Sequence, residues 1–180
     1  MSNSNIKLRF YYPKVENLLE AVRFLVVDLK LDPSHQNKEG ENALHLICTN
    51  ESDTQDLTPV ARFLVENGAD IKVKVNNGVD TALHYLCSNP NHDSSIGILR
   101  FLIEKGIDVH AKDYEGDGAL HELCRNSNGG TLGLDLVRVI VEAGIDVKAR
   151  TLDGSTAVYI LMDRKDEMVN AFDIVQFLID

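Results

Sequence analysis

A histidine and a cysteine that recur together are the residues in this sequence best suited to chemistry. The three pairs are His45 and Cys48, His84 and Cys87, and His121 and Cys124. Residues three apart lie on one face of a helix, so each pair could offer an imidazole and a thiolate to a zinc ion. The same two groups could act as base and nucleophile if they lay within about 2.6–3.2 Å of each other.

The residues around the pairs repeat, which favours a structural role. The phrase Ala-Leu-His-x-x-Cys begins at Ala43, Ala82 and Ala119, and an altered fourth copy begins at Ala157. Equivalent residues of packed helices lie about 8–10 Å apart, whereas zinc ligands and bridged cysteines must lie closer. We therefore expect each cysteine to fill a small buried site and each histidine to hold the neighbouring turn. No catalytic residue, metal or cofactor is predicted, and metal or redox chemistry by these pairs is the remote alternative.

A second apolar phrase sets the length of the repeat. Its one polar residue falls at Arg23, Arg62, Arg100, Arg138 and Gln176, in steps of 39, 38, 38 and 38 residues. A glycine, an extended stretch and a turn rich in Asn, Asp and Gly follow it. One unit is therefore predicted to be a helix, a loop, a second helix and a protruding hairpin. We also expect the three central arginines to form ion pairs with the glutamates four residues later.

Together, the two phrases resemble the ankyrin repeat. The resemblance lies in the Ala-Leu-His head and the Leu-Ile-Glu-x-Gly-x-Asp-Val tail, and it runs from about Leu18 to Asp180. It implies an all-α repeat solenoid of stacked helix-loop-helix units with protruding β-hairpin turns. The unit exceeds the usual length of about 33 residues because the loop between its helices is long. In this long loop and in its Leu-His-x-Leu-Cys motif, the chain is similar to ankyrin proteins of poxviruses and intracellular pathogens.

The repeat divides the sequence into a single predicted domain over residues 1–180. Its parts are an N-terminal capping half-repeat at 1–39, repeats at 40–77, 78–115 and 116–153, and an incomplete C-terminal repeat at 154–180. The sequence stops where a further Gly-x-Asp stretch would follow the last helix. We therefore expect either a fragment of a longer chain or a naturally short protein.

The composition disfavours several classes of function. A net charge of −10 over 180 residues argues against a nucleic-acid-binding surface. No apolar run approaches the roughly 20 residues of a membrane span, and the first residues lack the apolar core of a signal peptide. Three widely spaced cysteines suit a reducing compartment. We expect a cytoplasmic protein, monomeric when alone, that could also enter the nucleus or act inside a host cell.

The resemblance further implies a non-enzymatic scaffold that binds another protein on a concave surface. Hairpin tips and the exposed side of the first helices form such a surface. The expected tip residues are Lys38, Glu39, Asn76, Asn77, Tyr114, Glu115, Leu152 and Asp153, and the expected helix-face residues are Thr49, Ser88, Arg125 and Asp163. Tyrosine and arginine often dominate binding hot spots. A structural or spacer segment of a larger polypeptide is the alternative.

Basic residues recur in the extended stretch that precedes each hairpin. They are Lys72, Lys74, His110, Lys112, Lys148 and Arg150. In a chain of net charge −10 they form a basic row with one pair of residues per repeat. We predict that an acidic segment of the partner docks along this row, where complementary charge raises association rate and specificity more than affinity.

Overall fold

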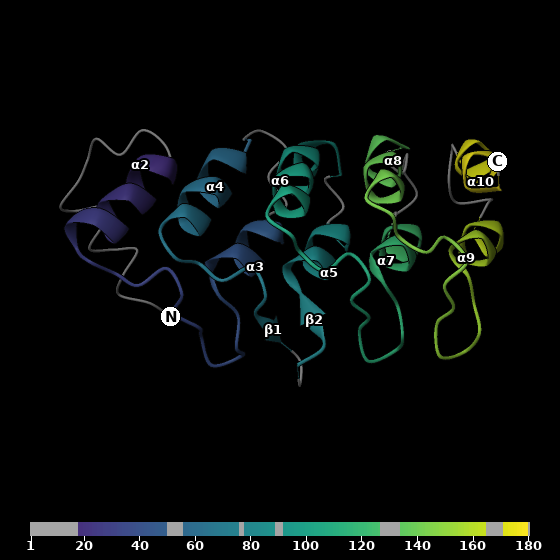
Figure 1. The fold of residues 1–180 in the computed structure, drawn as a ribbon, viewed down its shortest axis with the longest axis horizontal. Coiled ribbons are helices and arrows are strands. Elements are labelled where there is room, and N and C mark those ends of the chain that lie inside the picture. Colours follow the sequence, from purple (N-terminus) through teal and green to yellow (C-terminus); the bar gives the residue numbers. More distant parts are fainter. Residues whose placement is uncertain are drawn as a thin grey trace.

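Short helices stand in two rows, and hairpin turns project from one side of the stack (Figure 1). The computed structural model describes residues 18–49, 56–75, 78–88, 92–126, 134–164 and 171–179. The first row contains α3 (Ala43–Cys48), α5 (Ala82–Cys87), α7 (Ala119–Asn126) and α9 (Ala157–Asp163). The second contains α2 (Leu18–Arg23), α4 (Thr58–Glu66), α6 (His92–Glu104), α8 (Leu134–Glu142) and α10 (Ala171–Ile179). A π-helical turn, η1 (Phe24–Asp28), extends α2.

Each helix packs on its equivalent in the next unit. In the first row α3 contacts α5, α5 contacts α7, and α7 contacts α9, while α2, α4, α6 and α8 form the second series. Leu44, Leu83 and Leu120 occupy the same place in successive units and are all buried in one continuous core. The predicted all-α repeat solenoid is confirmed. The unit boundaries drawn from the sequence stay a prediction.

Local hydrogen bonds explain where the first-row helices begin. Asn42 caps α3, and its Oδ1 accepts the Leu44 N–H at 3.1 Å. The Thr156 hydroxyl accepts the Tyr159 N–H in the same way at the start of α9. A side-chain acceptor at this position satisfies an amide that would otherwise lack a partner. A polar residue directly before the helix therefore sets the start of α3 and of α9.

Glycines close the hairpins that join one unit to the next. Gly40, Gly78, Gly116 and Gly154 all have a φ between 79° and 87°, a conformation that residues with a β-carbon rarely adopt. Before Gly78 and after it, strands β1 (Lys74–Val75) and β2 (Asp80–Thr81) pair in antiparallel register. In the following unit the pairing is reduced to one bridge between Lys112 and Gly118.

Arg23, Arg62 and Arg138 of the second row contact aromatic rings. Within the described residues, the expected pairs Arg62–Glu66, Arg100–Glu104 and Arg138–Glu142 are not formed, so that prediction is wrong. The Arg62 guanidinium lies 4.5 Å from the centre of the Phe101 ring in the next unit. Arg23 and Arg138 lie similarly over Phe63 and Phe177. A guanidinium over a ring gains a cation–π contact, so these arginines tie adjacent units together.

A pair of glycine substitutions separates backbone strain from crowding between hairpins. A β-carbon on Gly116 would lie 2.9 Å from the Leu152 nitrogen, whereas one on Gly144 would meet nothing within 4 Å. Both have positive φ, so Gly144→Ala should lose about 1 kcal/mol of stability from strain alone. Gly116→Ala should lose at least about 1 kcal/mol more, because overpacking adds to the strain. Urea unfolding of the two variants measures the difference, and equal losses would contradict the contact between hairpins.

Candidate functional site

Two hollows of opposite charge border the hairpins. The acidic hollow has a volume of about 320 Å³ and is lined by Thr49, Asp80, His84, Tyr85, Ser88, Asp113, Tyr114, Glu115 and Glu122. The basic hollow has a volume of about 450 Å³ and is lined by Val109, His110, Ala111, Lys112, Gly118, Leu120, His121, Ile145, Asp146, Lys148, Ala149 and Arg150. They share no residue, so the chain offers two separate surfaces beside the same hairpin.

Carboxyl groups from three consecutive units meet in and around the acidic hollow. The Tyr85 hydroxyl donates a hydrogen bond of 3.0 Å to Glu41 of the preceding hairpin. Glu122 on α7 is half-buried, and burial, followed by the negative charges of Asp117 and Asp113, raises its pKa to about 7. Asn126 donates to the Glu122 carboxyl at 2.5 Å. Glu122 therefore takes up a proton near neutral pH, which an ordinary surface glutamate does not.

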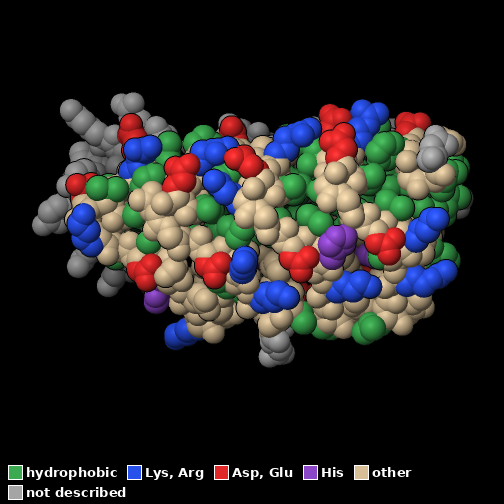
Figure 2. Space-filling model, viewed as in Figure 1, with side chains coloured by type: hydrophobic (Ala, Val, Ile, Leu, Met, Phe, Trp, Pro, Cys, Tyr) green, Lys and Arg blue, Asp and Glu red, His purple; other side chains and the backbone are tan. Residues whose placement is uncertain are grey.

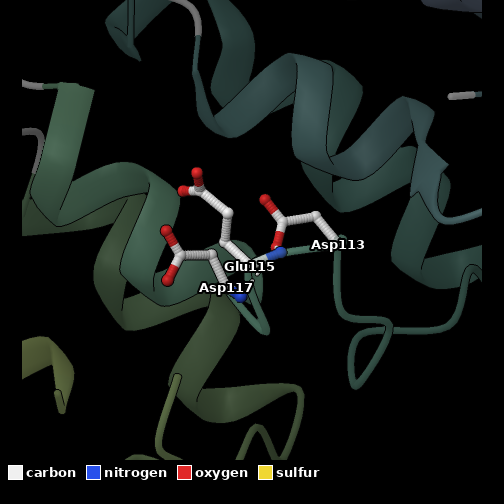
Figure 3. Close-up of side chains that lie close together, drawn as sticks. All are labelled: Asp113, Glu115 and Asp117. Atoms are coloured by element: carbon white, nitrogen blue, oxygen red, sulfur yellow. Dashed lines mark hydrogen bonds between the residues drawn. The ribbon is translucent and has the colours of Figure 1, made fainter. Parts of the chain in front are cut away.

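The tightest acidic group in the described ranges is formed by Asp113, Glu115 and Asp117. One carboxylate oxygen of each lies within 4.8 Å of the others, and the three side chains project from one hairpin tip (Figure 3). Asp113 Oδ1 accepts the backbone N–H groups of Glu115 and Asp117, each at 2.8 Å. These bonds hold the turn and explain the cluster without a ligand. The absence of a bound metal stays a prediction.

Arg125 lies beside the acidic hollow but is engaged within the chain. Its Nε and Nη2 donate to the two Asp117 oxygens at 2.7 and 3.0 Å. Asp117 is fully buried, so it depends on this bidentate partner. Hydrogen bonding to Asp117 raises the pKa of Arg125. The side chain therefore fixes the hairpin on α7, and any contact with a partner would use only its exposed part.

Other expected contact residues project from the hairpin tips. Tyr114 is 68% exposed and Leu152 is 80% exposed. The Leu152 N–H donates to the Glu115 carbonyl at 2.9 Å, so the two tips that carry these side chains are held together. Lys38 and Glu39 are exposed on the first hairpin. Asn76 and Asn77 lie outside the described residues.

The basic residues all lie exposed on the arms that lead to the hairpins, which are residues 69–75, 107–113 and 145–151. Each arm contains a turn where the sequence predicted an extended stretch; in the second and third arms the Asp108 and Asp146 carbonyls accept the N–H groups of Ala111 and Ala149. Figure 2 shows Lys, Arg and a His gathered beside the hairpins, with carboxylates between them. Lys112 Nζ donates to the Arg150 carbonyl at 2.8 Å and so bridges two arms. Arg150 donates to the Gly154 carbonyl at 2.6 Å. The structure thus brings the predicted basic row together on neighbouring arms.

The three histidines lie buried at the helix starts. In the most complete case, the Gly118 N–H donates to His121 Nδ1 at 3.2 Å, and His121 Nε2 lies 3.1 Å from the Ala149 carbonyl. Since Nδ1 accepts, Nε2 carries the proton and donates to the next arm. Burial lowers the pKa of His45, His84 and His121, so they are neutral at pH 7. Acidification below the ordinary histidine pKa of 6.5 opposes folding, because the histidines bind protons more readily in the unfolded chain than in the folded protein.

The cysteines are present as buried thiols, one in each of three first-row helices. Burial raises the pKa of Cys48 and Cys124 to about 12 and that of Cys87 well above its ordinary value. A protonated thiol is a poor nucleophile and a poor metal ligand. Within the described residues, no His-Cys pair belongs to a cluster with metal-binding geometry.

The acidic hollow was missed by sequence reasoning. Its key residue, Glu122, directly follows a repeated histidine, and the equivalent positions carry Leu46 and Tyr85. A position that changes from leucine to tyrosine to glutamate while its neighbours repeat is free of core packing. That contrast was the available signal, but only the stacking shows that Glu122 lies near Asp113 and Asp117.

Comparison with known proteins agrees with the geometry. A family model described as ankyrin repeats, in three copies, matches residues 14–113 and 56–151. The chain therefore belongs to the ankyrin repeat family. Ankyrin repeats generally mediate protein–protein interaction, and the family is typically non-enzymatic. A search among curated proteins found no match. No helix in the described ranges is long and apolar enough to cross a membrane.

Substitution of Glu122 should change how stability depends on pH. The pKa of Glu122 is about 7 in the folded protein, whereas the ordinary pKa of a glutamate is 4.5. Between these two pH values the unfolded chain releases the proton more readily than the folded protein, so the wild type loses stability as the pH rises. Glu122→Gln cannot ionise and should be more stable than wild type at pH 8. Its advantage should vanish below pH 4.5. Urea titrations of both proteins test this, and because both keep the histidines, a pH-independent difference would refute the burial of a carboxylate.

Thiol labelling tests the redox alternative. Since Cys48, Cys87 and Cys124 are almost fully buried, iodoacetamide should modify none of them in the folded protein and all three in urea. Ser88→Cys, at an exposed position, provides a reactive control. Mass spectrometry counts the modified thiols. Labelling of a native cysteine as fast as the control would support redox or metal chemistry.

Proposed function

We propose that this chain is a non-catalytic scaffold that binds another protein across its hairpin tips and the adjacent first-row helices. The proposal depends most on the exposed Tyr114 and Leu152 on adjacent tips. Large, solvent-exposed apolar side chains are typical anchors of protein-binding sites. The Leu152–Glu115 backbone bond holds their tips in place before a partner arrives, which reduces the entropy lost on binding.

The acidic hollow supports a polar contribution to the same surface. It places the exposed faces of Tyr85 and Ser88 beside the tip that carries Tyr114. Hot spots are usually apolar anchors ringed by polar groups that exclude water. In this proposal Tyr114 and Leu152 anchor the partner, and the carboxyl groups nearby orient it. Arg125 acts through Asp117, whose position it fixes.

The proposal includes a cellular setting and a state of assembly. Three buried thiols suit a reducing compartment, so we place the protein in the cytoplasm, with the nucleus or the interior of a host cell as further settings. We propose that it is monomeric until it meets its partner. A net charge of −10 supports a protein partner over a nucleic acid.

Affinity capture tests the proposed surface. Cell lysate is passed over the immobilised wild type, over Tyr114→Ala/Leu152→Ala, and over the control Leu29→Ala/Phe172→Ala, which removes two exposed apolar side chains elsewhere. A partner should be recovered equally by wild type and control and at least tenfold less by the first variant, as expected for loss of hot-spot contacts. Quantitative mass spectrometry measures recovery.

Two outcomes of the affinity capture would contradict the proposal. A partner retained by Tyr114→Ala/Leu152→Ala would move the binding surface away from the tips. If no protein distinguishes the wild type from an unrelated control chain, the spacer function replaces the scaffold. Circular dichroism of each variant excludes unfolding as the cause of lost binding.

A further inference from the structure

Six basic side chains share one exposed surface on the three arms, which we call the basic arm surface. Its members are Lys72, Lys74, His110, Lys112, Lys148 and Arg150. In the part of the chain that the structure describes, none of the six forms an ion pair. Exposed cations normally find carboxylates easily in a chain with 28 acidic and 18 basic residues. In those described residues the five Lys and Arg side chains therefore have no carboxylate partner, and Lys112 and Arg150 donate only to backbone carbonyls.

The acidic residues of the arms are directed into their own backbone. Asp70, Asp108 and Asp146 each precede a basic residue by two positions. Their Oδ1 atoms accept the N–H of Lys72, His110 and Lys148 at 2.8, 3.0 and 2.9 Å. Each arm thus holds one of these carboxylates in a turn and exposes two basic side chains. Residues 69–75 and 145–151 each hold one aspartate and two Lys or Arg residues, whereas residues 107–113 hold Asp108 and Asp113 against Lys112. With histidine neutral, the local positive charge therefore lies on the first and third arms.

The basic hollow shows that these arms leave room for a ligand between them. Its volume of about 450 Å³ is flanked by His110, Lys112, Lys148 and Arg150, and Val109, Ala111 and Ile145 supply apolar lining. Lys112 crosses from its own arm to the Arg150 carbonyl, so the second and third arms lie side by side. A main chain lying across the arms could contact apolar groups below it and cations on both sides.

The distance between neighbouring arms determines which peptide conformation can place one side chain on each arm. Units stacked through packed helices repeat about every 8–10 Å. A polyproline II segment rises about 3.1 Å per residue with three residues per turn, so every third side chain lies on one face, about 9.3 Å apart. A β-strand places alternate residues on one face, only about 6.6 Å apart. Only the first arrangement matches one carboxylate to each arm.

We propose that the basic arm surface binds an extended, polyproline II-like segment of a partner protein in which an acidic residue occurs at every third position. Each acidic side chain meets the pair of basic groups on one arm, and the backbone between them lies over the basic hollow. The inference extends the proposed scaffold function to a second surface, since the acidic hollow and the hairpin anchors share no residue with it.

Direct binding of designed peptides tests the spacing. One fluorescent peptide, rich in proline, carries four glutamates at every third position, and a second carries the same residues with the glutamates at every second position. Fluorescence anisotropy at low salt should give at least tenfold tighter binding for the first peptide. About 0.5 M salt should abolish the binding, because exposed charges are then screened beyond a few ångströms. Equal affinity for the two peptides would overturn the proposed register.

Charge reversal locates the site. Lys74→Glu/Lys112→Glu/Arg150→Glu should weaken binding of the first peptide at least tenfold. Lys72→Glu/Lys148→Glu disrupts no side-chain hydrogen bond in the described structure, so it tests the surface even if the triple variant unfolds. As a control, Lys30→Glu/Arg100→Glu makes the same change in net charge as Lys72→Glu/Lys148→Glu at exposed positions outside the arms and should weaken binding far less. Similar losses in arm and control variants would reduce the effect to net charge.

Two further comparisons separate this inference from the proposed function and from nucleic-acid binding. Tyr114→Ala/Leu152→Ala should bind the peptide normally, because those side chains lie outside the basic hollow. Loss of peptide binding in that variant would place the peptide on the hairpin tips and overturn the arm site. Single-stranded DNA with the same number of charges should bind at least tenfold more weakly, and equal binding would identify a general polyanion site instead.

Discussion

No unit of this chain can cover its own apolar face, and the rest of the structure follows from that constraint. His121 is 3% exposed, whereas Tyr159, 38 residues later at the equivalent place in α9, is 61% exposed. His121 lies against the arm of the next unit, where its Nε2 is 3.1 Å from the Ala149 carbonyl. Burial is therefore conferred by the neighbouring unit. Stacking fixes the helices in two rows and makes the hairpins project at regular intervals from one side (Figure 1).

The same stacking determines how polar groups are distributed. Inside the stack, the neutral His121 joins the start of α7 to the next arm through Gly118 and Ala149. A charged group there would lack solvation, and burial accordingly lowers the histidine pKa values. The buried carboxylate of Asp117 is neutralised by Arg125, and the repeat arranges the exposed charges in rows on the surface. A binding scaffold and a charged surface thus arise from one periodic pattern.

Neighbouring units also change what individual surface residues do. On an isolated helix Arg62 would pair with Glu66, but in the stack it lies over Phe101 of the next unit. Arg125 looked like an exposed binding residue, yet it neutralises the buried Asp117. Glu122 has an elevated pKa because it is partly buried in the stack and because carboxylates from the hairpin come close to it. In each case a contact between elements distant in sequence outweighs the local preference.

The sequence by itself determined the 38-residue period, the order of helices and hairpins, the burial of the His-Cys pairs, and the exposure of Tyr114 and Leu152. These features depend on local spacing, helix capping and glycine conformation, which neighbours along the chain dictate. Only the tertiary structure decided that Glu122 borders an acidic hollow, that Arg125 binds Asp117, and that Lys112 bridges to the Arg150 arm. Those contacts depend on how far each unit is shifted and rotated against the next. Side-chain packing across the whole interface sets that geometry, and no local pattern encodes it.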